Sequence, residues 1–136
     1  MPLPTELLEA YRKTDYAVFG KPELVLRIGE RSADLDELLE AEGAQTAAFI
    51  TAANPGGRAR GAWPNEVANA ALVEALNKAG VRCFEGEGRA RDRKWVEKSV
   101  LAVGISRDDA EKAGRAFGQN AIVFVERGRA PELVPL

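Results

Sequence analysis

The sequence has 136 residues, of which 46% are hydrophobic and 29% are charged, and its formal net charge is −2. This length is sufficient for one domain with a hydrophobic core, and the charge disfavours a general nucleic-acid binder, which usually carries a strong basic excess. The absence of histidine excludes histidine-dependent catalytic triads and the usual zinc ligand sets. The single cysteine, Cys83, excludes an internal disulfide and is typical of a reducing cytoplasm. No apolar run is long enough to predict a membrane span.

The first third of the chain is predicted to hold two helices and a strand. Thr5 caps an amphipathic helix over residues 5–16, which we expect to be peripheral to the core. Residues 23–29 read as a strand that ends at a glycine. Ser32 then caps a short helix that is acidic in its first turn, as the helix dipole favours.

The rest of the chain alternates between strands and helices. Apolar runs predict strands over residues 46–53, 81–86, 94–105 and 120–128 and a final strand over 131–136, with helices beginning at Pro64 and after Ser106. The order from about 46 to 126 is βαββαβ, which is that of a ferredoxin-like unit. We therefore expect an α+β fold in one domain, residues 1–136. It should have a mainly antiparallel sheet, helices packed on one face, and an added N-terminal helix and strand.

A turn, Asn54-Pro55-Gly56-Gly57, connects a predicted strand to a predicted helix. These residues are strong turn formers, so they are consistent with a tight connection that has no further role. The turn also precedes a helix N-terminus, where free amide groups favour an anion, and Arg58 and Arg60 add positive charge there. Both interpretations remain open.

Two further segments carry chemically useful side chains. The basic segment 86–94, which includes Arg89 and Arg91, is either a solvated loop or a loop that closes over an anionic ligand. If the following segment is a strand, Trp95 and Glu97 point to the same face. They then form either a rim tryptophan beside a paired glutamate, or a stacking platform beside a general base or amine-binding carboxylate.

Five short features of the sequence belong together: TAANP (51–55), Asn65, GEG (86–88), WVEKS (95–99) and FGQNA (117–121). In combination they resemble an uncharacterised bacterial family, catalogued as domain of unknown function 3293. The resemblance implies a bacterial origin and a single compact domain, and it brings no activity or site assignment. The string TAANPGG is also similar to the strand end that cradles ADP-ribose in macrodomains, although a macrodomain would be longer and richer in glycine loops.

We expect a small cytoplasmic domain that binds an anionic or nucleotide-like small molecule at strand-end loops, with no cofactor and no metal. Glu97 is the candidate catalytic residue. The candidate ligand-binding residues are Asn54, Arg58, Arg60, Trp63, Asn65, Arg89, Arg91, Trp95 and Glu97. The alternative is a protein-interaction or regulatory module without a pocket. The terminal strand offers an edge for a homodimer, whereas nucleic-acid and membrane partners are disfavoured.

Overall fold

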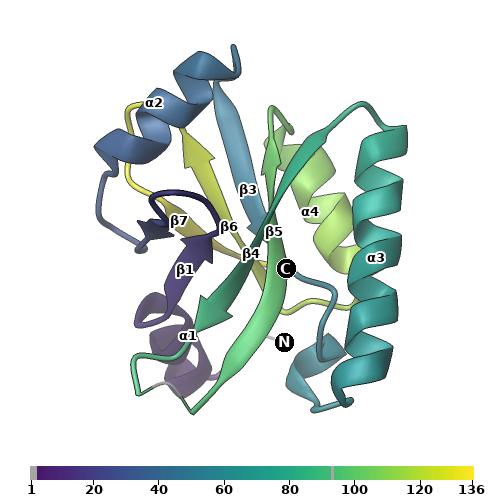
Figure 1. Ribbon diagram of the computed structural model, residues 1–136. Helices are drawn as coiled ribbons and strands as arrows, with labels where there is room; N and C mark the ends of the chain where they lie inside the picture. The colour runs from purple at the N-terminus through teal and green to yellow at the C-terminus, as the bar shows by residue number, and fades with distance from the viewer. Residues whose placement is uncertain (1–2, 93) are drawn as a thin grey trace.

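The computed structural model describes residues 3–92 and 94–136 (Figure 1). Its helices are α1 (Thr5–Arg12), α2 (Ala33–Ala41), α3 (Ala62–Lys78) and α4 (Arg107–Ala116), with a short 3₁₀ turn at Pro55–Gly57. Its strands are β1 (Asp15–Val18), β2 (Leu24–Leu26), β3 (Thr46–Ile50), β4 (Arg82–Arg89), β5 (Val96–Val103), β6 (Ala121–Glu126) and β7 (Glu132–Pro135). Across the described residues, no helix combines the length and the apolar character needed to cross a membrane.

The seven strands form one curled sheet in the order β2-β1-β4-β5-β3-β6-β7 (Figure 1). Every neighbouring pair is antiparallel. The predicted α+β class with a mainly antiparallel sheet is therefore confirmed. Strand β1 lies between β2 and β4, so the N-terminal segment extends the sheet.

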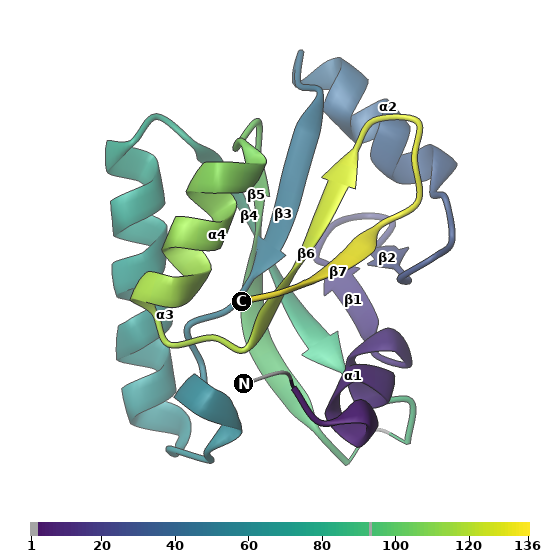
Figure 2. The ribbon, with the colours of Figure 1, turned by 180° about the vertical axis from the view of Figure 1, so that it is seen from behind.

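The helices cover both faces of the sheet, so the prediction of helices on one face is wrong. Helices α3 and α4 lie side by side on one face, where Leu72 and Ala110 join one buried cluster (Figure 2). Helix α2 packs on the opposite face through Leu35 and Leu39, which belong to a second cluster. The helix pattern of α2 reveals its apolar side but does not reveal which face of the sheet that side will cover.

Strand β3, in the interior of the sheet, explains why both faces need cover. Ala47 and Phe49 point into the cluster beneath α2, whereas Ala48 and Ile50 point into the cluster beneath α3 and α4. Because successive side chains of a strand alternate between faces, a continuous apolar run is stable only where both faces are buried.

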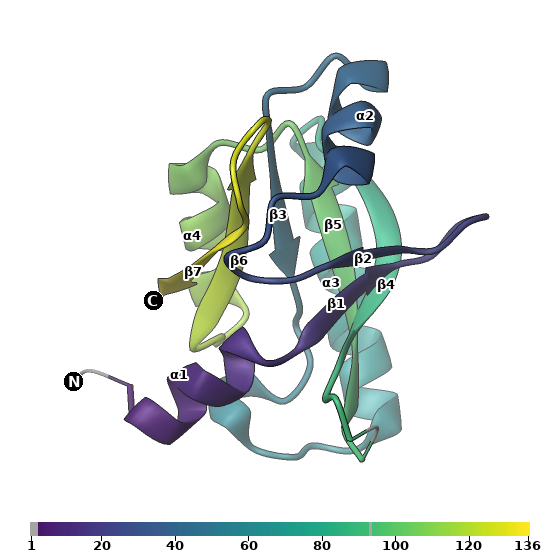
Figure 3. The same cartoon turned by 90° about the vertical axis from the view of Figure 1, so that its left-hand side faces the viewer.

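The N-terminal helix is shorter than predicted and has no buried residue. It ends at Arg12 because residues 15–18 pair with β4 as strand β1. Figure 3 shows α1 at the same end of the sheet as the β4–β5 turn and the segment that follows β3. Two of the predicted helix caps are formed, since the hydroxyls of Ser32 and Ser106 each accept a backbone N–H at 3.1 Å.

Candidate functional site

A cavity of about 490 Å³ lies between α1 and the sheet, on the face that α3 and α4 leave open. Its walls come from α1, β1, the end of β3 and the turn after it, the β4–β5 hairpin, β6 and β7. The lining residues are Leu7, Ala10, Tyr11, Thr14, Tyr16, Phe49, Thr51, Asn54, Ala59, Gly88, Ala90, Trp95, Glu97, Ser99, Gln119, Ala121, Ile122, Val123 and Leu133. Segments that are far apart in the sequence therefore meet around one hollow.

Glu97, near the start of β5, is the one acidic side chain among the lining residues that the structure describes. Its Oε2 accepts a hydrogen bond from Nδ2 of Asn54 at 3.0 Å. Its Oε1 has no hydrogen-bond partner among the described residues, and no fully buried polar side-chain atom there lacks one, so Oε1 is not fully buried. Burial raises the pKa of Glu97 from 4.5 to about 7, and the hydrogen bond from Asn54 opposes this shift.

The geometry of Asn54 directs its amide nitrogen at Glu97. The residue adopts a left-handed conformation, with φ of 47° and ψ of 60°, which asparagine tolerates better than most residues. Its Oδ1 accepts from Nδ2 of Asn65 at 2.8 Å and from the backbone N–H of Arg60 at 3.0 Å. Oδ1 of Asn65 accepts from the backbone N–H of Asn54 at 2.8 Å. This reciprocal pair with α3 leaves Nδ2 of Asn54 for the carboxyl group.

The segment that ends β3 is also held from two other elements. Asn69, buried in α3, accepts from the backbone N–H of Ala52 at 3.0 Å. Gln119, after α4, donates from Nε2 to the carbonyl of Ala53 at 3.1 Å. The strings TAANP and FGQNA thus meet in space, and the turn at Asn54 has little freedom to move away from β5.

Four aromatic side chains, Tyr11, Tyr16, Phe49 and Trp95, contribute to the remaining wall. Tyr16 and Phe49 meet edge to face with ring centroids 5.2 Å apart, and the hydroxyl of Tyr16 donates to the carbonyl of Tyr11 at 2.7 Å. Trp95 lies at the rim and is 39% exposed. Burial raises the pKa of both tyrosines, and the nearby Glu97 adds to each shift, so both hydroxyls stay neutral at physiological pH.

The predicted basic residues do not line the cavity. The side chain of Arg60 binds its own loop, because its Nη2 donates a hydrogen bond to the carbonyl of Ala52 at 3.0 Å. Arg58 is exposed to solvent, and Trp63 on α3 is 74% exposed. None of these three residues lines the cavity. Their positions therefore do not support the anion site that we expected at this turn.

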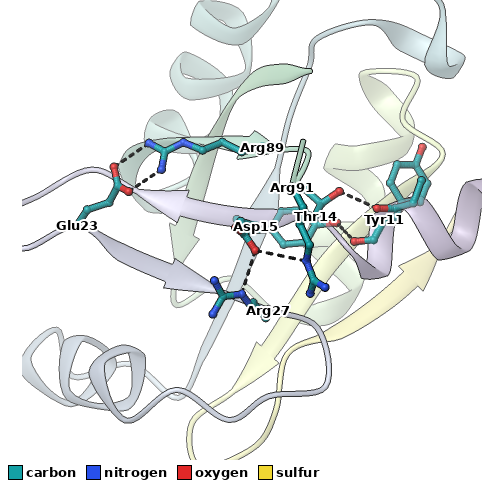
Figure 4. A network of polar contacts seen from close by, with 9 residues as sticks. Tyr11, Thr14, Asp15, Glu23, Arg27, Arg89 and Arg91 are labelled. Carbon is teal, nitrogen blue, oxygen red and sulfur yellow. Dashed lines mark hydrogen bonds and ion pairs between the residues drawn. The ribbon is translucent and has the colours of Figure 1, made fainter. Parts of the chain in front are cut away.

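Two arginines of the hairpin, Arg89 and Arg91, lie beside carboxylates (Figure 4). Arg89 forms two hydrogen bonds to Glu23, at 2.6 and 2.8 Å, and a third to Glu87 at 2.7 Å. Arg91 lies 4.0 Å from Asp15, which Arg27 also contacts. These pairs fasten the β4–β5 hairpin to β1 and to the residues that precede β2. The predicted basic segment 86–94 also includes residue 93, which lies outside the described residues.

Of the residues that the sequence singled out, the structure thus brings Asn54, Trp95 and Glu97 together at the cavity, with Asn65 behind them. Sequence reasoning missed Tyr11, which it placed in a peripheral helix, and it missed Tyr16 and Phe49, which are spread over two strands. The signal for Tyr11 was present, because it shares the apolar face of its helix with Leu7.

The described residues offer no cluster of three or more His, Cys, Asp or Glu side chains that could hold a metal ion. Cys83 is half-buried on β4 and does not line the cavity, and burial raises the pKa of its thiol. The chemistry available at the site is therefore a single carboxyl that can exchange a proton near neutral pH, set in a largely apolar hollow.

Comparison with known proteins identifies a family. The model of the family described as "Protein of unknown function (DUF3293)" matches residues 50–122. No curated protein and no solved structure matches the chain. The matched range contains Asn54, Trp95, Glu97 and Gln119, whereas α1, which forms one wall of the cavity, lies before it.

Proposed function

The chain belongs to the DUF3293 family of proteins of unknown function, and from that premise we propose that it binds a small molecule in the cavity between α1 and the sheet. The observation that carries this proposal is the convergence of Asn54, Trp95 and Glu97 on one hollow of about 490 Å³. Pockets for small molecules typically measure about 300–1,000 Å³ and combine an apolar wall with a few placed polar groups.

The lining favours a ligand with an apolar body and one polar group. Phe49, Val123 and Leu133 supply apolar surface, while Oε1 of Glu97 offers a hydrogen-bond acceptor, or a donor when it is protonated. No lysine or arginine is present among the described lining residues. Because a buried carboxylate repels an anion, we favour a neutral or positively charged polar group over the anion that the sequence led us to expect.

Glu97 is the residue that we propose for any proton transfer to a bound ligand. A general acid or base works best when its pKa lies near the working pH, and burial brings the pKa of Glu97 to about 7. Asn54 would hold the carboxyl in place through Oε2 while Oε1 meets the ligand.

We infer that the core from β3 to β6 is a ferredoxin-like unit. The strand order β4-β5-β3-β6, the antiparallel pairing, and the position of α3 and α4 on one face all support this assignment. Such a unit leaves the other face of its sheet uncovered. In this chain α2 covers one end of that face and α1 lies over the other, with the cavity beneath it.

The two tryptophans provide a matched test of the binding site. Trp63→Phe leaves Trp95 at the cavity as the only indole, and Trp95→Phe leaves Trp63 on the exposed side of α3. Both variants would be screened against small organic cations, neutral compounds and anions by fluorescence and thermal denaturation. We expect ligands to change Trp95 fluorescence and to raise Tm, since a ligand at 100 times its Kd adds about 2.7 kcal/mol to stability.

Two outcomes would contradict the proposal. A ligand that changes the fluorescence of Trp63 and leaves Trp95 unaffected would place the binding site elsewhere. A screen in which no compound alters either Tm or Trp95 fluorescence would favour the alternative, a protein-interaction or regulatory module.

A further inference from the structure

We propose that the ligand is a small organic cation whose tertiary or quaternary ammonium group sits between Glu97 and the aromatic wall of the cavity. This inference rests on the proposed function and adds the charge class of the ligand. It is carried by three features of the site: the aromatic side chains, the carboxyl group of Glu97, and the apolar surface around them.

Aromatic side chains are concentrated around the cavity. Both tyrosines of the chain, Tyr11 and Tyr16, line it together with Phe49 and Trp95, although aromatic residues make up only 7% of the sequence. The electron-rich faces of such rings attract cations, and aromatic-lined cavities are a common way to hold quaternary ammonium groups. An apolar ligand alone would be served equally well by aliphatic side chains.

Within the described part of the cavity wall, the one charged side chain is negative. Glu97 lines the cavity, and no lysine or arginine does so among the described residues. The nearest arginine of β4, Arg89, is held by Glu23 and Glu87 and does not reach the cavity wall. A cation would therefore restore local neutrality and would also lower the pKa of Glu97, releasing a proton where that carboxyl is protonated.

The apolar surface of the wall favours a substituted ammonium over a primary one. A primary ammonium has three N–H donors that need acceptors when buried, whereas the methyl groups of a quaternary ammonium pack against rings and aliphatic side chains. Phe49, Val123 and Leu133 offer such surface in the cavity. The carboxyl group of Glu97 then supplies the opposite charge without having to accept an N–H.

The test compares three probes of nearly the same shape that differ in charge: choline, 3,3-dimethylbutan-1-ol and 3,3-dimethylbutanoate. Binding to Trp63→Phe would be followed by Trp95 fluorescence and by ligand-observed NMR at pH 8 and pH 5.5. We expect choline to bind about tenfold more tightly than the alcohol at pH 8, and the butanoate to bind most weakly. The advantage of choline should shrink at pH 5.5, where Glu97 is mostly protonated.

Substitution of the carboxyl provides the matched control. Glu97→Gln keeps the shape and the hydrogen bond from Asn54 but removes the charge, so we expect it to abolish most of the discrimination between choline and the alcohol. Glu85→Gln, an exposed position of β4, should leave it unchanged. Calorimetry in buffers of different ionisation enthalpy should show that choline binding releases about half a proton at pH 7.

Failure of this inference can be told from failure of the proposed function. Equal affinity for choline and the alcohol, or tightest binding of the butanoate, would overturn the cation assignment while leaving the cavity as a binding site. The same holds if none of the three probes binds but another compound changes Trp95 fluorescence in the wider screen. If no compound in either screen binds, both proposals are wrong.

Discussion

Glu97 should make the protein less stable as pH rises, and Glu97→Gln should remove this dependence. Burial raises the pKa of the folded-state carboxyl from 4.5 to about 7, so between these values the folded protein binds more protons than the unfolded chain. The free energy of unfolding therefore falls as pH rises through this window. The full loss is about 3 kcal/mol above the folded-state pKa, since each unit of pKa shift corresponds to about 1.4 kcal/mol.

Glutamine resembles the protonated glutamic acid and can still accept from Asn54, so the variant should match the wild type at pH 4.5 and exceed it by about 3 kcal/mol at pH 8. For a domain of this size that difference corresponds to roughly 10 °C in Tm. Urea denaturation and thermal melts across pH 4.5 to 8 would measure it. Glu85→Gln, at an exposed site, serves as the control and should follow the wild type. If the free energies of unfolding of the wild type and Glu97→Gln change with pH in parallel, the argument that folding desolvates Glu97 is refuted.

Three substitutions test the framework around the site. Asn69→Ala should lower the stability by about 2–3 kcal/mol in urea denaturation, because it leaves the buried N–H of Ala52 without its acceptor. Gly118→Ala should lower Tm and weaken ligand binding, since its φ is 70° and a Cβ there would lie 2.9 Å from Cβ of Pro55. Gly86→Ala should expose the amides of β1 to hydrogen exchange, because its Cβ would overlap the carbonyl of Ala17 and separate β1 from β4.

The elements from β3 to β6 were predictable because their local signals agree. Apolar runs mark the strands, and Ser106 marks the start of α4. Helix α3 shows the spacing of three and four that buries Leu72 and Leu76. The position of α2 was not predictable from its own pattern. The apolar run of β3 did carry a hint, since a strand that is buried on both sides requires cover on both faces.

The candidate site was predictable in its residue types and not in its electrostatics. Asn54 and Glu97 were singled out separately, but their contact depends on the register that pairs β3 with β5. The arginines suggested an anion because the sequence does not show what neutralises them. Arg89 is paired with Glu23, which precedes β2 and is brought close only when β1 joins the sheet beside β4.

The position of β1 between β2 and β4 has a consequence for the order of events during synthesis. Residues 15–18 leave the ribosome well before residues 86–89, with which they pair. Contacts between segments so distant in the chain form slowly, because a long loop must close before they gain any stabilisation. Strand β1 can pair with β2 as soon as both are made, but its other edge stays unpaired until β4 is made. The cavity wall that the N-terminal segment supplies through Tyr11 and Tyr16 can close only after that.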